Sequence, residues 1–367
     1  ETGYILEGSG QKIGNRVLLT VQLLDGASGH HLWSKQYDRE IEKVEDLIDI
    51  QSEVAQLVAG EIKAVITPEE KQLMEKIPTA DLTAYDLFQR GMEEYGNYLR
   101  KDDMKALDRA DNYFHEALGI DSTYAQAYAG LAIMYAEKQY MSGTLIENAD
   151  SMLILANIAL SYDEQSYVAY VTRGNYYRIF GNYDLALKDY EKAVRLNPNS
   201  GVAYYFTAIV YMNFDFVKSL EILHKAINLD RGEDLYDYLQ LLGFEYFLPG
   251  FLDKSNHYYS ELLKLSGDSS TYYYLMALNT YYSGEDNMAI DYARKAILLD
   301  SASSQDILGD ALLRVGKHKE ALEVYRNWLA HTHEGELFEA DWTHRIAYAY
   351  WINGLKKEAE YYFEKQI

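Results

Sequence analysis

The sequence predicts a mostly α-helical chain, in which a right-handed α-solenoid of helical hairpins follows a small α+β module of three antiparallel strands and one helix. Two observations predict the solenoid: a small residue recurs about every 34 residues through most of the chain, and turn glycines separate successive apolar segments. A third observation predicts the module, because the first 66 residues show the alternating pattern of strands. Repeats of this length bury their apolar faces only by stacking on their neighbours.

The first residues predict an antiparallel meander with tight turns at Gly14-Asn15 and after Asp25. Leu19 and Val21 share one face of the second strand, as a half-buried sheet requires. A single helix follows and is expected to cover that apolar face. The expected elements are strands at Tyr4–Gly10, Arg16–Asp25 and His31–Tyr37 and a helix from about Val44 to Ile66, with an apolar stripe at Val44, Leu47, Gln51, Val54, Val58, Ile62 and Val65.

Residues 67–80 predict a helical linker. Thr67 is a suitable N-cap, Pro68 fits the first helical position, and Glu70 completes a capping box. The helix is expected from Glu69 to Lys76, because the following Ile-Pro pair disfavours its continuation. We therefore place the α+β module at 1–66, the linker at 67–80 and the solenoid at 81–367.

The repeat pattern is clearest between Tyr170 and Pro198. Small residues allow the two helices of a hairpin to cross closely, aromatic residues are expected to fill the gaps between successive hairpins, and Pro198 ends the second helix. About eight hairpins are expected from about Leu82 to the end of the chain. The small first-helix position recurs at Gly91, Ala132, Gly174, Ala208, Gly243, Ala277, Gly309 and Ala347, and the turn glycine at Gly181, Gly250, Gly284, Gly316 and Gly354.

This spacing resembles that of tetratricopeptide repeats over about three quarters of the chain; Arg173 departs from it, since the family favours Leu there. The resemblance implies a concave groove that binds an extended peptide or a partner helix. Asn175 and Arg178 would fix a peptide backbone or terminal carboxylate. The alternative is that the aromatic residues cover one another and bind nothing. The implied groove residues are Ile133, Val171, Asn175, Arg178, Tyr205, Ile209, Met212, Gln240, Phe244, Phe247, Tyr274, Leu278, Tyr281, Asp306 and Asp310.

The module carries a second resemblance, to the C-terminal half of the TolB-like (FlgO-type) domain. The matching motifs are Leu6-Glu7-Gly8-Ser9, Gln22-Leu23-Leu24-Asp25, His31-Leu32-Trp33 and Tyr37-Asp38-Arg39. The resemblance implies that the chain opens in the middle of this domain, and that another segment or a second chain covers the edge at Tyr4–Gly10. It also implies a bacterial signalling or transcription-regulatory protein whose effector domain lies elsewhere.

Charge and composition narrow the classes of partner. Asp and Glu total 57 against 34 Lys and Arg, a net charge of −23 at pH 7, which repels phosphate backbones and favours basic or polar protein partners. We therefore expect no direct nucleic-acid binding. The absence of cysteine excludes disulfides and thiol catalysis. No run of eighteen apolar residues exists, so we expect no membrane-spanning segment. A cytoplasmic location is expected, with the periplasmic part of a membrane-anchored protein as the alternative.

No residue pattern predicts catalysis, a metal or a cofactor. Ser9 is flanked directly by glycines, which is not the spacing of a nucleophile elbow. The best metal-like cluster is weak, since it rests on a single His-x-His, and a loop or helix-cap role is favoured. Two hypotheses remain: a non-catalytic interaction scaffold, or a small-molecule sensor with an enclosed pocket in the superhelix. The weak cluster comprises His331, His333, Glu334, Asp341 and His344.

Overall fold

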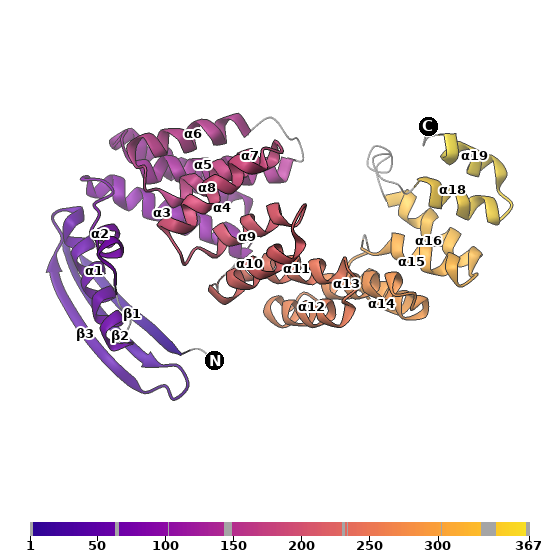
Figure 1. Ribbon diagram of the computed structural model, residues 1–367, viewed down its shortest axis with the longest axis horizontal. Coiled ribbons are helices and arrows are strands. Elements are labelled where there is room, and N and C mark those ends of the chain that lie inside the picture. The colour runs from indigo at the N-terminus through magenta and orange to yellow at the C-terminus, as the bar shows by residue number, and fades with distance from the viewer. Residues whose placement is uncertain are drawn as a thin grey trace. The chain divides into compact units, whose positions relative to one another are not determined.

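The computed structural model describes residues 3–62, 66–101, 103–142, 149–229, 232, 234–301, 303–331 and 343–364. The chain forms two compact units, Glu1–Asn199 and Ser200–Ile367. A three-stranded antiparallel sheet and two single helices open the first unit, and helix pairs make up the rest of the described parts of both units (Figure 1). The predicted class, a mostly helical solenoid-like chain preceded by a small sheet, is confirmed. The boundaries at 66/67 and 80/81 remain predictions, as does the handedness of the solenoid.

The sheet is a meander of β1 (Tyr4–Ile13), β2 (Arg16–Asp25) and β3 (His31–Glu40), in the order β1-β2-β3. The bounds of β2 match the prediction, whereas β1 and β3 run beyond their predicted ends. Leu19 lies opposite both Gly10 of β1 and Tyr37 of β3, so these residues share one face of the sheet. This is the face that the alternation of β2 predicted to be buried.

Helix α1 (Val44–Glu61) packs on that face, with Ile50 in one buried cluster with Val21, Tyr37 and Ile41. The helix ends at Glu61, so its predicted end at Ile66 is wrong, and Val65 lies outside the described residues. The predicted stripe is only partly right, since Ile48, Ile50 and Ser52 are buried while Gln51 is exposed. Val54, Val58 and Ile62 are not buried, because they line an open pocket between α1 and the sheet.

The linker helix α2 (Pro68–Met74) begins as predicted. The Thr67 backbone N–H donates to Glu70 Oε2 over 2.7 Å, and the Glu70 N–H donates to Thr67 Oγ1 over 3.2 Å, which is a reciprocal capping box. The helix ends at Met74, short of the predicted Lys76. Lys76 instead pairs with Asp163 over 2.5 Å, which ties the end of the linker to the loop that follows α6.

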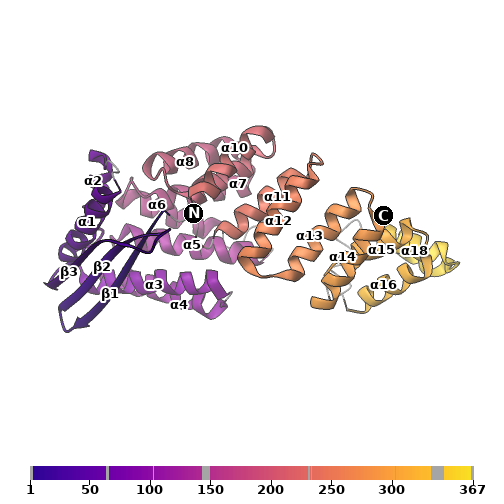
Figure 2. The ribbon, with the colours of Figure 1, turned by 90° about the horizontal axis from the view of Figure 1, so that it is seen from below.

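Eight helix pairs follow in the parts of the chain that the structure describes, as the repeat spacing predicted, and the helices of a pair lie side by side (Figure 2). The pairs of the first unit are α3 (Leu82–Lys101) with α4 (Met104–Ile120), α5 (Ala125–Ser142) with α6 (Ala149–Tyr162), and α7 (Tyr167–Ile179) with α8 (Tyr183–Leu196). Those of the second unit are α9 (Gly201–Tyr211) with α10 (Phe216–Leu229), α11 (Leu235–Phe247) with α12 (Leu252–Ser266), α13 (Ser269–Tyr282) with α14 (Asp286–Leu299), α15 (Gln305–Arg314) with α16 (His318–His331), and α18 (Thr343–Ile352) with α19 (Lys356–Glu364).

The turn between α7 and α8 shows how a pair is closed. Gly181 has φ +72°, in the left-handed region that favours glycine. The Asn182 N–H donates back to the Tyr177 carbonyl over 2.8 Å, which satisfies a carbonyl that the helix end would otherwise leave unpaired. The turn glycine predicted from spacing is therefore the left-handed residue that follows the helix C-cap, Phe180.

Glycine in the first helix makes room for an aromatic ring of the second. A Cβ on Gly174 would lie 2.5 Å from the Tyr190 ring, so only glycine fits there. From the sequence, these aromatic rings were predicted to fill the gaps between successive helix pairs. That prediction is incomplete, because the rings also fill the space where the two helices of their own pair cross. Phe114 does both, since it contacts Gly91 of its own pair and Gly130 of the next. The glycine–ring contacts are Gly91–Phe114, Gly174–Tyr190, Gly243–Tyr259 and Gly309–Tyr325.

Candidate binding groove

In the first unit, Asn175 and Arg178 lie on one face of α7, as predicted. Asn175 is buried, and its side-chain oxygen accepts a 2.7 Å hydrogen bond from the Tyr190 hydroxyl. The Arg178 Nε contacts the same oxygen over 3.5 Å. This oxygen therefore already has partners inside the fold, and a bound peptide would have to compete for it.

Asp310 occupies the same repeat position in the second unit, directly after Gly309, and accepts a hydrogen bond from the Tyr325 hydroxyl. Arg345 pairs with its other oxygen, and the Tyr281 hydroxyl lies 3.4 Å from that atom. Burial raises the pKa of Asp310, while the bond from Tyr325 and the positive charge of Arg345 act in the opposite direction. Asp310 thus belongs to an internal network, and its two oxygens are both engaged.

The pair α11–α12 breaks this pattern. The residue after Gly243 is Phe244, whose side chain offers no acceptor. The fully buried hydroxyl of Tyr259 has no hydrogen-bond partner within the described residues. Phe244 itself is 37% exposed. The position that is polar in α7 and α15 is therefore apolar and accessible in α11.

An apolar pocket of about 640 Å³ lies beside Phe244. Three predicted groove residues, Phe244, Phe247 and Leu278, contribute to it, and the Phe247 ring meets the edge of Tyr282 at a centroid distance of 5.2 Å. Tyr282 is 62% exposed, so the pocket opens to solvent. The full lining is Phe244, Phe247, Leu248, Pro249, Gly250, Leu252, Leu278 and Tyr282. The turn residues and Tyr282 were not predicted from the sequence, because family spacing pointed only to the first-helix positions.

The other predicted residues of the second unit do not join this pocket. The Tyr205 ring lies 5.0 Å from the buried ring of Tyr238, so it covers another aromatic residue. Burial raises the pKa of both Tyr274 and Tyr281, and Tyr281 is held by Arg314, whose guanidinium carbon lies 4.5 Å from the ring centroid. Partly exposed residues at the remaining positions are Ile209, Met212 and Gln240.

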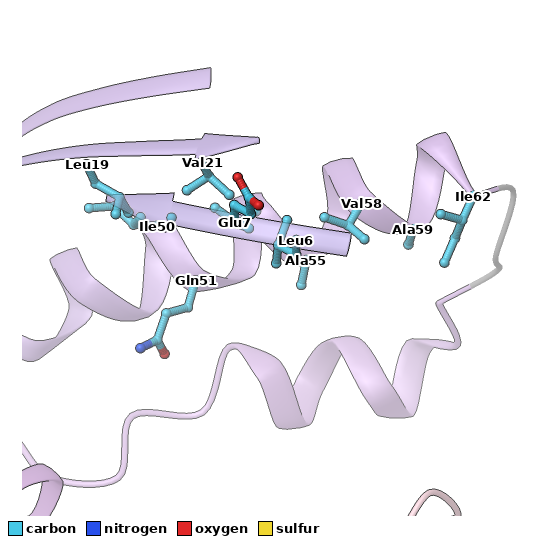
Figure 3. Close-up of a pocket in the computed structure, with 12 residues that line it drawn as sticks. Leu6, Glu7, Leu19, Val21, Ile50, Gln51, Ala55, Val58, Ala59 and Ile62 are labelled. Carbon is cyan, nitrogen blue, oxygen red and sulfur yellow. The ribbon is translucent and has the colours of Figure 1, made fainter. Parts of the chain in front are cut away.

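A second apolar pocket, of about 610 Å³, lies between β1, β2 and α1 and was not predicted. Figure 3 shows Leu6 of β1 beside Ala55 and Val58 of α1, with Gln51 turned away. All ten residues of β1 are exposed. The sequence did indicate an uncovered strand, because it predicts three strands and only one helix. A helix about 10 Å wide is too narrow to cover three strands that lie about 4.8 Å apart. One strand of the predicted module had to remain uncovered by α1.

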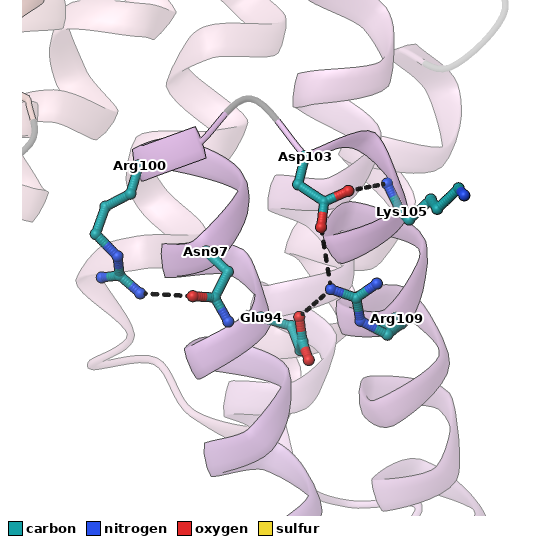
Figure 4. A network of polar contacts seen from close by, with 6 residues as sticks. All are labelled: Glu94, Asn97, Arg100, Asp103, Lys105 and Arg109. Atoms are coloured by element: carbon teal, nitrogen blue, oxygen red, sulfur yellow. Dashed lines mark hydrogen bonds and ion pairs between the residues drawn. The ribbon is translucent and has the colours of Figure 1, made fainter.

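Polar clusters elsewhere have structural roles. At the turn between α3 and α4, Arg109 bridges Glu94 at 2.7 Å and Asp103 at 3.2 Å (Figure 4). The Arg109 guanidinium holds the pKa of Glu94 below its ordinary value. Asp103 also accepts from the Lys105 N–H over 3.0 Å, which caps α4. The bridge and the cap join the ends of the two helices.

The chain offers no developed metal centre in the part that the structure describes, where no group of three or more potential ligands gathers. Of the weak predicted cluster, His333, Glu334 and Asp341 lie outside the described residues, whereas His331 ends α16 and His344 lies in α18. Among the described helices, none has both the length and the apolar character needed to cross a bilayer.

Residues 167–200, which span α7 and α8, match the family model of the tetratricopeptide repeat. Over 162 residues the chain is 30% identical to a Rhizobium meliloti protein named "Putative adenylate cyclase 3", covering 44% of this chain and 26% of that protein. Over 204 residues it is 27% identical to a TPR repeat-containing protein of Methanocaldococcus jannaschii, covering 51% and 35% respectively. The chain therefore spans about a quarter to a third of the lengths of these curated relatives.

Two solved structures are similar at lower identity. A tetratricopeptide repeat protein from Parabacteroides merdae has a TM-score of 0.46 at 16% identity, covering 76% of this chain and all of that one. A TPR protein from Thermus thermophilus has a TM-score of 0.41 at 18% identity, covering 50% of this chain and 92% of that one. Neither similarity bears on binding. Residues 167–200 therefore match a tetratricopeptide repeat, and seven further helix pairs in the described parts of the chain share its two-helix form.

Proposed function

We propose that this chain is a non-catalytic interaction scaffold. It binds a peptide or helix of a partner protein in a groove that is lined by the first helix of each helix pair. The open apolar pocket at Phe244, Phe247 and Leu278 carries the proposal, because it gathers three residues that the repeat spacing placed on one face. Apolar anchors that enter such a pocket supply much of the energy of a typical interface.

The proposed partner carries an apolar anchor close to a basic group. Tyr282 lines the pocket, its ring lies 5.3 Å from that of Tyr281, and the Tyr281 hydroxyl reaches Asp310. Asp306 lies one helical turn before Asp310 and is partly exposed. Burial raises the pKa of Asp306, and the negative charge of Asp310 adds to this effect. When it is ionised, the Asp306 carboxylate would attract a partner's cation. The net charge of −23 favours the same partner over an acidic one.

The rival proposal is a small-molecule sensor. It requires an enclosed cavity with a few converging polar groups. The pocket at Phe244 is instead open, and no charged side chain among the described residues lines it. This geometry favours the peptide.

We also propose that this segment is the input or regulatory part of a bacterial signalling or transcription-regulatory protein and that it acts in the cytoplasm. The relative named as an adenylate cyclase supports a signalling context, although the match covers only 26% of that protein. The TolB-like resemblance of residues 1–66 points the same way and remains a prediction.

Self-association through the β1 edge is part of this proposal. The strand is exposed along its whole length, and an uncovered edge readily pairs with another strand.

The binding proposal is tested by selecting peptides from a displayed random library on the full chain and measuring their affinity by fluorescence polarisation. Binding should weaken in Phe244→Ala and persist in Phe214→Ala, an exposed aromatic residue outside the pocket. Selected peptides should also be enriched in basic residues next to an apolar one. Peptides that bind both variants equally would overturn the proposed site.

A further inference from the structure

Two buried hydrogen bonds join successive helix pairs in the second unit. Ser219 of α10 bonds to Glu245 of α11, and Asn279 of α13 donates to Ser255 of α12 over 3.0 Å. Both serines occupy the same position of the second helix, where later pairs have Ala289 and Ala321. Glu245 and Asn279 also occupy equivalent positions, two residues after the small residue of the first helix. The four residues are buried, so each polar pair requires an explanation of its own.

The hydrogen atoms at Ser219 can be counted. Its Oγ lies 2.7 Å from the Ala208 carbonyl and 2.5 Å from Glu245 Oε1. A hydroxyl has one proton to donate, and a carbonyl oxygen can only accept. If Glu245 were ionised, Ser219 would face two acceptors and could satisfy only one. Both contacts are satisfied if the Glu245 carboxyl keeps its proton and donates to Ser219, which in turn donates to Ala208.

The second oxygen of Glu245 leads to the same conclusion. Glu245 is 0% exposed, and its Oε2 has no hydrogen-bond partner among the residues that the structure describes. A buried carboxylate with one oxygen wholly unpaired is strongly disfavoured, whereas a neutral acid tolerates this environment much better.

Three basic groups of the neighbouring helices are engaged elsewhere. From α10, Lys218 donates to the Tyr211 hydroxyl and His224 bonds to the Tyr246 hydroxyl. From α12, Lys254 lies over the Tyr246 ring at 4.8 Å. Burial raises the pKa of Glu245 to about 7, and the hydrogen bond with Ser219 offsets only part of this.

We propose that Glu245 is a proton-dependent lock between α10 and α11. The neutral acid joins the two helix pairs through Ser219, and its ionisation loosens the packing of α9–α10 on α11–α12. The pair Ser255–Asn279 makes the corresponding link with a neutral amide, so the junction between α12 and α13 lacks this sensitivity.

The direction of the effect follows from proton binding. Between the ordinary Glu pKa of 4.5 and the folded value of about 7, the folded chain holds a proton that the unfolded chain has lost. Stability of the junction therefore falls as pH rises through this window and levels off above it. The opening equilibrium should change by on the order of a hundredfold across the window.

The test measures amide hydrogen exchange of the full chain from pH 5 to 8.5, corrected for the intrinsic pH dependence of exchange. Protection in α10 and α11 should fall with rising pH, while α7 and α8 serve as the internal reference. Glu245→Gln, which mimics the neutral acid, should abolish the fall, and Glu221→Gln, at an exposed site on α10, should leave it intact.

An infrared measurement keeps the proposal testable if Glu245→Gln fails to fold. A wild-type chain whose glutamate side-chain carboxyls carry carbon-13, which separates them from aspartate, should show at pH 6 a labelled protonated-carboxyl band that disappears at pH 8.5 with the same midpoint as the loss of protection. A Glu245 that is already ionised at pH 5, or protection in α10 and α11 that follows the reference at every pH, would overturn the proposal.

Discussion

The Tyr190 hydroxyl donates a 2.7 Å hydrogen bond to Asn175, the residue that follows the glycine at the crossing of α7 and α8. The same relationship joins Tyr325 to Asp310 at the crossing of α15 and α16. Glycine admits the ring, and the next residue satisfies the buried hydroxyl at its tip. Tyr259 has the glycine but lacks the acceptor, because Phe244 follows Gly243.

Removal of the Tyr190 hydroxyl should therefore destabilise the chain, whereas removal of the Tyr259 hydroxyl should not. Tyr190→Phe leaves the Asn175 oxygen with less than its full set of partners and is expected to cost about 1–2 kcal/mol. Tyr259→Phe deletes a buried hydroxyl without a partner and should be neutral or stabilising by up to about 1 kcal/mol. Urea unfolding of the two variants beside the wild type measures the difference. Equal losses in both would show that the hydroxyls are not distinguished by their acceptors.

The glycine at the crossing leads to a second prediction. Gly174→Ala places a Cβ 2.5 Å from the rigid Tyr190 ring and should destabilise the chain by about 1–3 kcal/mol. Gly119 in α4 provides the matched control, since a Cβ there meets nothing within 4 Å. Gly119→Ala should stabilise the helix by roughly 0.5–1 kcal/mol. Thermal unfolding followed by circular dichroism compares the two, and a harmless Gly174→Ala would contradict the close crossing.

Features encoded by local spacing were predictable from the sequence. The bounds of β2, the capping box at Thr67 and the eight helix pairs each depend on residues a few positions apart, or on one repeated distance. The contact of Ser219 with Glu245 joins two helix pairs, and its strength depends on what else is buried there. Its only sequence signal was serine at a position that other repeats give to alanine.

The groove was predicted less well than the fold for the same physical reason. Spacing places Asn175, Tyr205 and Phe244 on equivalent faces, but it does not show what each side chain contacts. Asn175 is occupied by Tyr190, Tyr205 covers Tyr238, and Phe244 lines an open pocket. The difference comes from neighbouring residues far along the chain. The pairing of Gly174-Asn175 with a tyrosine sixteen residues after the glycine could have revealed the first of these contacts.

The third prediction separates binding from folding. Phe244→Ala and Phe247→Ala should each lower the affinity of the chain for a selected peptide by roughly tenfold or more, as truncation of an anchor residue at an interface does. Their free energies of unfolding should fall by less than that of Tyr190→Ala, which is fully buried and should lose about 3 kcal/mol or more. Tyr205→Ala should show an intermediate stability loss, because its ring covers Tyr238. The measurement pairs a peptide titration with a denaturant titration for each variant. If the phenylalanine variants keep their affinity for the peptide and lose as much stability as Tyr190→Ala, these residues belong to the core and not to a binding site.

The fourth prediction concerns the exposed edge at β1. Ile5 and Ile13 lie on the same face of this strand and are 39% and 65% exposed, so strand pairing between two copies would bury apolar surface as well as backbone groups. Light scattering should therefore show a mass that rises with concentration. Ile13→Lys should suppress the rise, because a charge on an edge strand opposes pairing. Leu298→Lys is the control, since Leu298 is 85% exposed and lies in α14, away from the sheet. A wild-type chain that stays monomeric at every concentration, with β1 open, would refute self-association through this edge.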